Sequence, residues 1–167
     1  MSKKRGGNPQ KFAARHRARE LAVQFLYSLE TYPVRDVDEA LELFMGEGSM
    51  AEADTPEAKE YCRFLVRGAW ERRGEIDELL LRVVTGWRPD RMVAVDRAVL
   101  RVTVFEGFLR HELPMKSAIS EAVEIAGAFG TKDSARFVNG VLARVSKAMP
   151  DSSPDTQDKT QDKQDKE

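Results

Sequence analysis

The chain has very few of the residues from which most catalytic and metal centres are built. Its 167 residues include one cysteine, Cys62, and two histidines, His16 and His111. One cysteine cannot form an internal disulfide, and histidines 95 residues apart do not predict a catalytic triad or a transition-metal site. Glu121 and Glu124 have helical i,i+3 spacing, which is typical of a solvated surface. The phosphate-binding patterns GxxxxGK[ST] and GxGxxG are also missing, so we predict no enzyme, no cofactor and no metal.

Long apolar runs are missing too. No run approaches the roughly 18 residues that a membrane span needs, and the N-terminus has no apolar signal core. We therefore expect a cytoplasmic protein that makes no membrane contact. Hydrophobic residues make up 41% of the chain, which is enough for the core of one domain. Cys62 lies among them at helical spacing, which predicts a buried, unreactive thiol.

The formal net charge of −1 hides a strong gradient along the chain. The first 19 residues contain seven basic residues and no acidic one, whereas residues 150–167 contain six acidic and three basic residues. No hydrophobic residue follows Met149, and the triplet QDK recurs in this tail. The sequence thus predicts a flexible basic arm over 1–11, a helical domain over 12–148 and a disordered acidic tail over 149–167.

Apolar residues repeat with the period of an α-helix through most of the remaining chain, which predicts an all-α fold of six or seven helices. The expected helices cover about 9–31, 37–45, 55–84, 93–110, 117–130 and 133–145, with Gly74 able to break or bend the third. Expected N-caps are Asn8, Thr55, Asp90, Ser117 and Asp133. Gly140 is expected to let a neighbouring helix approach closely.

The first expected helix contains the stretch ARHRARELAVQFLY, residues 14–27. Its basic residues are Arg15, His16, Arg17 and Arg19. Cations at a helix N-terminus oppose the macrodipole, so a sequence that needed only a soluble helix would place acids there. On a helical wheel Tyr27 lies opposite the apolar stripe, beside Gln24. The wheel also places Arg19 at the far edge of the polar face and Arg15 at the border of the stripe.

This arrangement favours a surface for single-stranded nucleic acid. Arginine suits phosphates and base edges, and an exposed tyrosine offers a stacking face for an unpaired base. The alternative is that the arginines pair with acids of the domain and that Tyr27 packs under a neighbouring helix.

Three segments resemble the NusB family of bacterial transcription antitermination factors. They are ARHRARELAVQFLYSLE, DRAVLRVTVFEGF and LPMKSAISEAVEIAGAFGTKDSARFVNGVLARV, in the order and spacing of that family. The similarity covers about 12–148 and is weaker over 33–85. It implies an all-α domain of about seven helices in two helical subdomains, without enzymatic activity.

The resemblance also implies partners. These are boxA, a short single-stranded RNA element of ribosomal-RNA leaders, the ribosomal protein NusE, and the RNA polymerase antitermination complex. It implies an RNA surface and a NusE contact at the following residues: Arg15, His16, Arg17, Arg19, Gln24, Tyr27, Phe129, Lys132 and Asp133 for RNA, and Asp96 and Phe137 for NusE. His16 departs from the family, which often has arginine there. Phe129 and Phe137 are core residues in the alternative interpretation, and Asp133 is then only an N-cap.

Two other functions remain open at this point. Similar helical domains form the RNA-recognition part of some ribosomal-RNA cytosine methyltransferases, a reading that needs a following catalytic domain. A helical bundle that acts only through protein contacts, as a homodimer, is the third interpretation.

Overall fold

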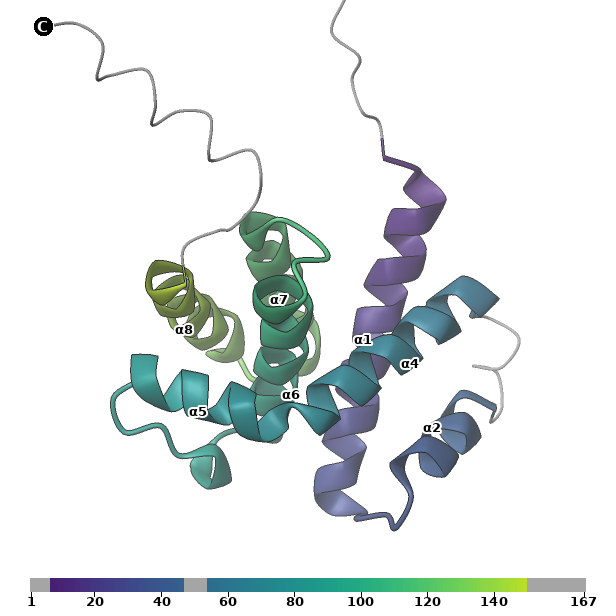
Figure 1. Cartoon of the computed structure of the whole chain (residues 1–167), viewed down its shortest axis with the longest axis horizontal. Helices are drawn as coiled ribbons and strands as arrows, with labels where there is room; N and C mark the ends of the chain where they lie inside the picture. The colour runs from purple at the N-terminus through teal and green to yellow at the C-terminus, as the bar shows by residue number, and fades with distance from the viewer. Residues whose placement is uncertain (1–6, 47–53, 150–167) are drawn as a thin grey trace, which may run out of the picture.

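A computed structural model describes residues 7–46 and 54–149, and these residues form helices joined by short turns (Figure 1). The α-helices are α1 (Pro9–Thr31), α2 (Val37–Gly46), α4 (Pro56–Glu71), α5 (Arg73–Val83), α6 (Ala94–Thr103), α7 (Met115–Phe129) and α8 (Ser134–Ala148). A short 3₁₀ helix, η1 (Pro89–Arg91), precedes α6, and a π-helix, η2 (Val104–Leu109), continues it. The described residues contain no strand, which confirms the predicted all-α class.

Helices whose sequence carries both a cap and a proline begin where expected. The Asn8 side chain accepts a hydrogen bond from the backbone N–H of Gln10 at 3.0 Å, and Pro9 opens α1. Thr55 accepts from the N–H of Ala58 at 3.2 Å at the start of α4. Both predictions are therefore confirmed, because each side chain satisfies a backbone donor that the first helical turn leaves free.

The expected helix over 55–84 is two helices. The chain bends at Arg72, whose φ of −96° and ψ of 11° lie outside the helical range, and α5 starts directly afterwards. Gly74 lies in the first turn of α5 and does not itself make the break. Apolar spacing continues across the bend, so the pattern alone gives no signal for it.

Two of the expected N-caps are wrong. Asp90 lies inside η1, and the cap residue of α6 is Val93, whose side chain makes no cap hydrogen bond. Ser117 lies within α7, which begins two residues earlier after Pro114. The fixed φ of proline supplies the start of that helix in place of a side-chain cap.

The helices pack in two groups around one hydrophobic core. Helix α1 packs along α4 with α2 beside it, α7 pairs with α8, and α6 contacts both groups (Figure 1). Buried residues from all seven α-helices join a single cluster that includes Phe25, Leu65, Leu100 and Leu142. This arrangement agrees with the expected two helical subdomains. It also buries Cys62 as predicted, and burial raises the pKa of its thiol to about 12, which disfavours the reactive thiolate.

Glycine permits close helix packing at positions other than the one expected. A Cβ on Gly68 of α4 would collide with the ring of Phe105, and a Cβ on Gly107 would lie 2.7 Å from Cβ of Ala118. Gly140 has no atom within 4 Å of the corresponding position, so the close approach predicted there is wrong.

The helix expected over 93–110 changes its winding halfway. From Val104 to Leu109 it follows a π-helix, and the N–H of Arg110 donates to the carbonyl of Phe105 at 2.9 Å. π-Helical turns are rare and often lie at functional positions. Here the wider turn carries Glu106 into the interior, where its side chain is buried.

Parts of the predicted organisation lie outside the described residues. These are most of the basic arm and nearly all of the acidic tail. Residues 9–11, counted above with the arm, belong to α1. Within the described residues, none of the helices combines the length and apolar composition of a membrane span.

Candidate functional site

Acidic residues neutralise much of the basic cluster at the start of α1. Arg17 donates from Nε to Asp54 at 2.7 Å and lies 3.5 Å from Glu20. The hydrogen bond from Arg17 to Asp54 raises the pKa of its guanidinium, although burial opposes this. Asp54 immediately precedes α4, so this pair ties the first half of α1 to that helix.

Arg19 lies in the interior, and its predicted place on the polar face is wrong. Its side chain is 7% exposed and makes a bidentate contact with Glu106, with N···O distances of 2.7 and 2.8 Å. Tyr61 donates its hydroxyl to the same carboxylate at 2.7 Å, and Glu121 lies 3.2 Å from Nη1 of Arg19. The helical wheel missed this contact because the partner comes from the π-helix, 87 residues away. Arg19 therefore holds helices together and offers almost no surface to a ligand.

His16 lies between carboxylates of two helices. Its Nδ1 donates to Glu121 of α7 at 2.7 Å, and its Nε2 lies 2.8 Å from Glu20 and 4.0 Å from Glu124. Burial lowers the pKa of His16, but the hydrogen bond to Glu121 and the charges of the three carboxylates outweigh it and raise that pKa above 6.5. The ring ties α1 to α7 through its close contacts with carboxylates at both ring nitrogens. Glu124 is exposed as expected, whereas Glu121 is half-buried.

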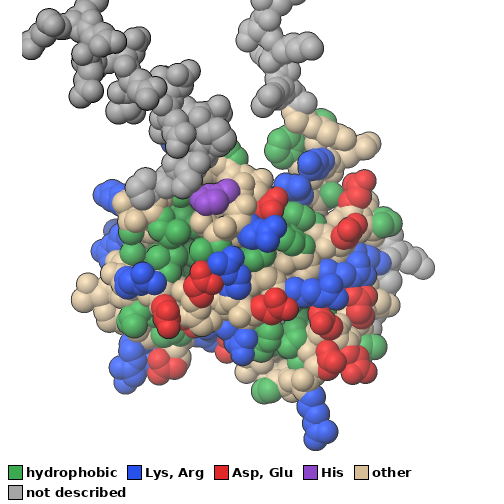
Figure 2. Space-filling model, viewed as in Figure 1, with side chains coloured by type: hydrophobic (Ala, Val, Ile, Leu, Met, Phe, Trp, Pro, Cys, Tyr) green, Lys and Arg blue, Asp and Glu red, His purple; other side chains and the backbone are tan. Residues whose placement is uncertain are grey.

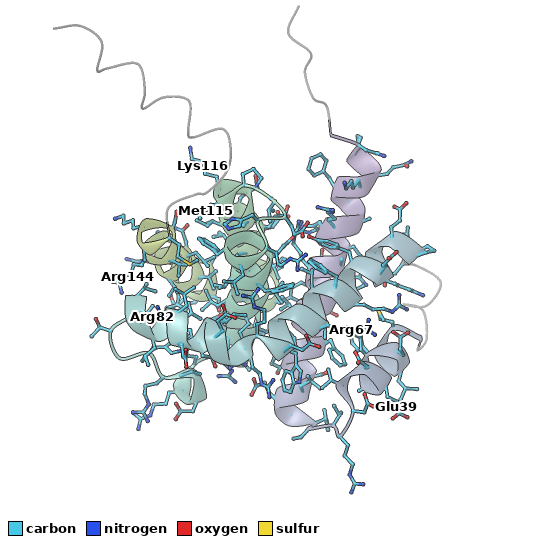
Figure 3. The ribbon with its side chains drawn as sticks, viewed as in Figure 1. Glu39, Arg67, Arg82, Met115, Lys116 and Arg144 are labelled. Atoms are coloured by element: carbon cyan, nitrogen blue, oxygen red, sulfur yellow. The ribbon has the colours of Figure 1, made fainter. Side chains whose placement is uncertain are left out.

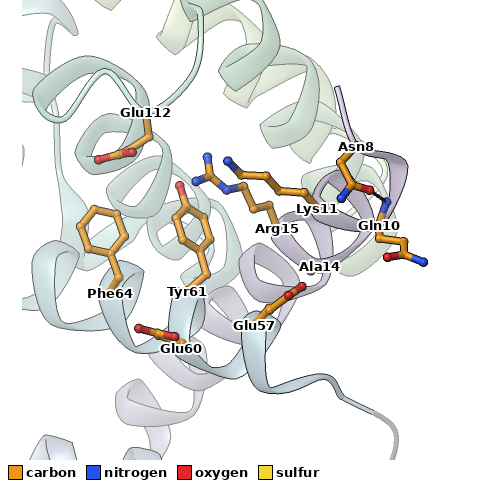
Figure 4. A pocket seen from close by; sticks show the side chains of 10 residues that line it. All are labelled: Asn8, Gln10, Lys11, Ala14, Arg15, Glu57, Glu60, Tyr61, Phe64 and Glu112. Carbon is orange, nitrogen blue, oxygen red and sulfur yellow. Dashed lines mark hydrogen bonds between the residues drawn. The ribbon is translucent and has the colours of Figure 1, made fainter. Parts of the chain in front are cut away.

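Arg15 is the basic residue of this cluster that pairs with no described carboxylate. Its guanidinium lies over the ring of Tyr61, 4.5 Å from the centroid (Figure 4). The two residues line a groove of about 540 Å³ between α1 and α4, with Lys11 on one side and Phe64 on the other (Figure 4). Glu57, Glu60 and Glu112 also line this groove, so it holds both cations and carboxylates.

Tyr27 is exposed, as its place opposite the apolar stripe predicts. Its relative exposure is 46%, and Gln24, one turn earlier, is partly exposed. The alternative to a nucleic-acid surface is therefore only half right. Two arginines, Arg17 and Arg19, do pair with acids of the domain, but Tyr27 does not pack under another helix.

Helices α1 and α7 start at the same end of the molecule and run in the same direction (Figures 1 and 3). Phe12 and Arg15 line a groove with Pro114 and Ser117 from the start of α7, whereas His16 contacts Glu121, farther along. The second half of α1, which carries Tyr27, and the end of α7 therefore point the same way.

A second group of exposed aromatic and charged residues surrounds the turn between α7 and α8. Phe129 at the end of α7 and Phe137 in the first turns of α8 are 39% and 38% exposed. Lys132 and Asp133 are exposed in the turn between them. The interpretation of both phenylalanines as core residues is therefore wrong, because their helices already bury other faces. The Asp133 carboxylate makes no hydrogen bond that caps α8, so its oxygens can accept hydrogen bonds from a ligand.

Two residues that the sequence analysis missed shape this turn. Ser134 is fully buried, and its hydroxyl accepts from the N–H of Thr131 at 2.9 Å. A Cβ on Gly130 would collide with that hydroxyl, so glycine is needed there. A Thr or Ser side chain that bonds the backbone three residues away is a recognised turn device, and the TKDS sequence could have indicated it.

Asp96 occupies a different environment from the one predicted. It lies at the start of α6 with 5% relative exposure, and its Oδ1 has no hydrogen-bond partner among the described residues. Little of its carboxylate is available to a protein partner in this conformation, so a NusE contact there stays a prediction.

The rest of the surface mixes both charges closely. On the face in view, acidic and basic side chains alternate over α2 and α4 (Figure 2). Exposed pairs such as Arg67 with Asp38, at 2.7 Å, account for part of this pattern. Exposed pairs of this kind contribute at most about 1 kcal/mol each.

The described residues define an all-helical protein with exposed aromatic and charged side chains on α1 and at the α7–α8 turn. The chain belongs to the NusB family, whose sequence model matches residues 16–147. The family is not enzymatic, and its curated members are named transcription antitermination proteins. The protein of that name from Symbiobacterium thermophilum is 42% identical over 139 residues, which cover 81% of this chain and 91% of the relative. The one from Myxococcus xanthus is 42% identical over 136 residues, 81% of this chain and 96% of the relative.

Solved structures of NusB proteins have a fold similar to that of this chain. The structure of T. maritima NusB has a TM-score of 0.70 and 34% identity, and the match covers 80% of this chain and 90% of that one. A crystal structure of the antitermination factors NusB and NusE in complex with dsRNA has a TM-score of 0.71 and 25% identity, with 81% and 98% covered.

Proposed function

We propose that this protein is an RNA-binding transcription antitermination factor that binds boxA-type single-stranded RNA of ribosomal-RNA leaders together with NusE. Family membership supports the antitermination role, and a related NusB is known in a complex with NusE and dsRNA. The observation that carries the proposal is the exposure of Tyr27 on α1 and of Phe129, Lys132 and Asp133 at the α7–α8 turn. Such rings stack on unpaired bases, which A-form duplexes do not offer.

The assignment of individual residues follows their exposure. Tyr27 and Phe129 are the stacking platforms, and Lys132, Lys11, Arg15 and the exposed Arg136 of α8 are the cations that contact phosphates. The exposed Asp133 accepts hydrogen bonds from exocyclic base amines, as carboxylates do from cytosine N4. Arg17 and Arg19 orient α1 through Asp54 and Glu106 and make no direct contact with RNA. Phe137 and Asp96 lie nearest to NusE, which also joins the protein to the RNA polymerase complex. Action on a nascent transcript places the protein in the cytoplasm.

Fluorescence anisotropy with a boxA RNA tests the electrostatic part. Four phosphate contacts give a slope of log K against log salt concentration near about −3. Lys132→Glu should weaken binding and make the slope shallower. Lys147→Glu, at the far end of α8, is the matched control and should leave both unchanged. Affinity that is indifferent to salt and to Lys132→Glu would contradict this part.

Tyr27→Ala tests stacking. Loss of one base–aromatic stack costs about 1–3 kcal/mol, so affinity should fall roughly 5- to 150-fold. Tyr32→Ala is the control, because Tyr32 follows α1 and is even more exposed. Equal effects of the two variants would show that Tyr27 has no special role.

Sequence preference and cooperation with NusE need their own comparison. A boxA RNA and a scrambled RNA of the same length are titrated with and without purified NusE. We expect boxA RNA to bind more tightly than the scrambled RNA. We expect a further gain in affinity when NusE is present, because a partner already bound to this protein holds the RNA close to the second binding surface. No difference between the RNAs would leave RNA binding intact but reject boxA specificity.

A further inference from the structure

Three side chains on the facing sides of α1 and α7 form a compact set of metal-ligating groups. His16, Glu121 and Glu124 each offer one ligand atom, and these atoms all lie within 4.8 Å of one another. They are the one such group of His, Cys, Asp and Glu side chains in residues 7–46 and 54–149. We propose that this group binds a divalent transition-metal ion, Zn²⁺ being the best fit, at the junction of α1 and α7.

The distances are close to those of a real site. Zn²⁺ binds imidazole nitrogen and carboxylate oxygen at about 2.0–2.2 Å, so tetrahedral ligand atoms lie about 3.4 Å apart. His16 Nδ1 is now 2.7 Å from Glu121, and Nε2 is 4.0 Å from Glu124. An ion on Nδ1 therefore requires the Glu121 carboxylate to move back slightly and the Glu124 carboxylate, which now lies nearer Nε2, to swing toward Nδ1. Glu124 can make this movement freely, because its side chain is 68% exposed.

The fourth carboxylate of the cluster supports the imidazole. Glu20 lies 2.8 Å from Nε2 of His16, where it accepts the ring N–H when Nδ1 binds the ion. Metal-bound histidines usually donate their other ring N–H to a carboxylate or carbonyl, which fixes the tautomer and raises ligand basicity. Glu20 thus serves as the outer partner and need not be a ligand.

The charges around the cluster leave room for a cation. Arg17 faces Glu20 at 3.5 Å and Arg19 faces Glu121 at 3.2 Å, whereas Glu124 forms no ion pair within 4.0 Å other than that with His16 among the described residues. A ligand imidazole nitrogen must be free of its proton, so protons compete with the ion and binding weakens in acid. Imidazole ligation also favours Zn²⁺, Ni²⁺ or Cu²⁺ over Mg²⁺, which prefers oxygen ligands and water.

Calorimetric titration of the full, untagged chain with Zn²⁺, in the absence of RNA, tests the site. We expect one ion per chain, with weaker binding at pH about 5.5 than at about 7.5. His16→Gln and Glu124→Gln should each reduce affinity at least about tenfold. His111→Asn is the control, since it removes the other histidine at a residue whose φ of 51° asparagine tolerates.

A second measurement separates metal ligation from a loss of folding. Co²⁺ bound through imidazole and carboxylates gives a visible absorption that should appear in the parent chain and in His111→Asn, and vanish in Glu124→Gln. Glu124 is exposed, so that variant keeps the fold. Absence of Zn²⁺ binding, equal affinity in all variants, or equal competition by Mg²⁺ would overturn the proposal and show only an imidazolium ion-pair cluster. RNA affinity is measured separately, so either proposal can fail alone.

Discussion

At the scale of single residues, burial decides which ion pairs matter. Arg19 and Glu106 have side chains only 7% and 2% exposed and meet in a bidentate contact, whereas Arg72 and Glu75 form a pair of similar length in solvent. A buried charge that loses its partner keeps its desolvation penalty, which an exposed charge does not have. Equal distances therefore predict unequal effects on the free energy of unfolding.

Glu106→Gln should destabilise the protein by about 3 kcal/mol, at the lower end of what breaking a buried pair costs, because Glu121 still faces Arg19. Urea unfolding followed by circular dichroism measures this. The control Glu75→Gln should change the free energy of unfolding by less than about 1 kcal/mol. Similar values for the two variants would contradict the buried role of Glu106.

The raised pKa of His16 gives stability a defined pH dependence. Because the folded-state pKa lies above the unfolded value of 6.5, the stabilisation is fully present below about pH 6.5 and is lost as pH rises through the folded-state pKa. The difference in melting temperature between the parent chain and His16→Gln should therefore be larger at pH about 6 than at about 9. The same comparison with His111→Asn should show no such trend, and a difference that grows with pH would contradict the imidazolium.

At the scale of helices, the boundaries that could be predicted are those with a physical marker. Asn8-Pro9 and Thr55-Pro56 combine a side-chain acceptor with a residue that lacks an N–H, and both helices start there. The bend at Arg72 has no such marker, and neither does the onset of the π-helix, where apolar residues continue on every side. The apolar periodicity of a sequence reports which residues are buried. The same face stays buried across a bend or a change from α- to π-helix, so the periodicity does not mark either one.

Two glycines within helices provide a matched test of packing. Gly68→Ala should destabilise the protein by about 1–3 kcal/mol, since the new methyl meets the Phe105 ring in a filled core. Gly140→Ala should instead stabilise it by about 0.5–1 kcal/mol, because that position is open and alanine favours the helix. Thermal and urea unfolding of both variants measure the two changes in the free energy of unfolding, which should have opposite signs. A gain in both would show that the core beside Gly68 is loosely packed.

At the scale of the whole molecule, the sequence predicted the exposure of some candidate site residues and not of others. Tyr27 was placed correctly, because its exposure follows from the geometry of one helix. Arg19 was not, because its partner comes from a π-helix 87 residues away. The exposure of Phe129 and Phe137 depends on how α7 and α8 meet, which the periodicity of either helix alone does not contain.

One continuous core predicts cooperative unfolding of both helical groups. Trp70 and Trp87 report on α4 and on the segment before α6, while circular dichroism reports on every helix. The urea transitions measured by tryptophan fluorescence and by circular dichroism should coincide, as they do for two-state domains. Separate midpoints would show that the two groups unfold independently. Light scattering on the same samples tests the homodimer, which stays a prediction.

The π-helix also bears on how this chain tolerates changes in length. A π-turn holds about one residue more than an α-turn, so deletion of one residue from Val104–Leu109 lets the segment relax into ordinary α-helix while its two ends stay in place. The same deletion inside α6 would rotate every later side chain by about 100° around the axis. Insertions and deletions among relatives should therefore collect at this turn. Relatives whose sequences lack the π-turn should also lack a buried acid at the position of Glu106.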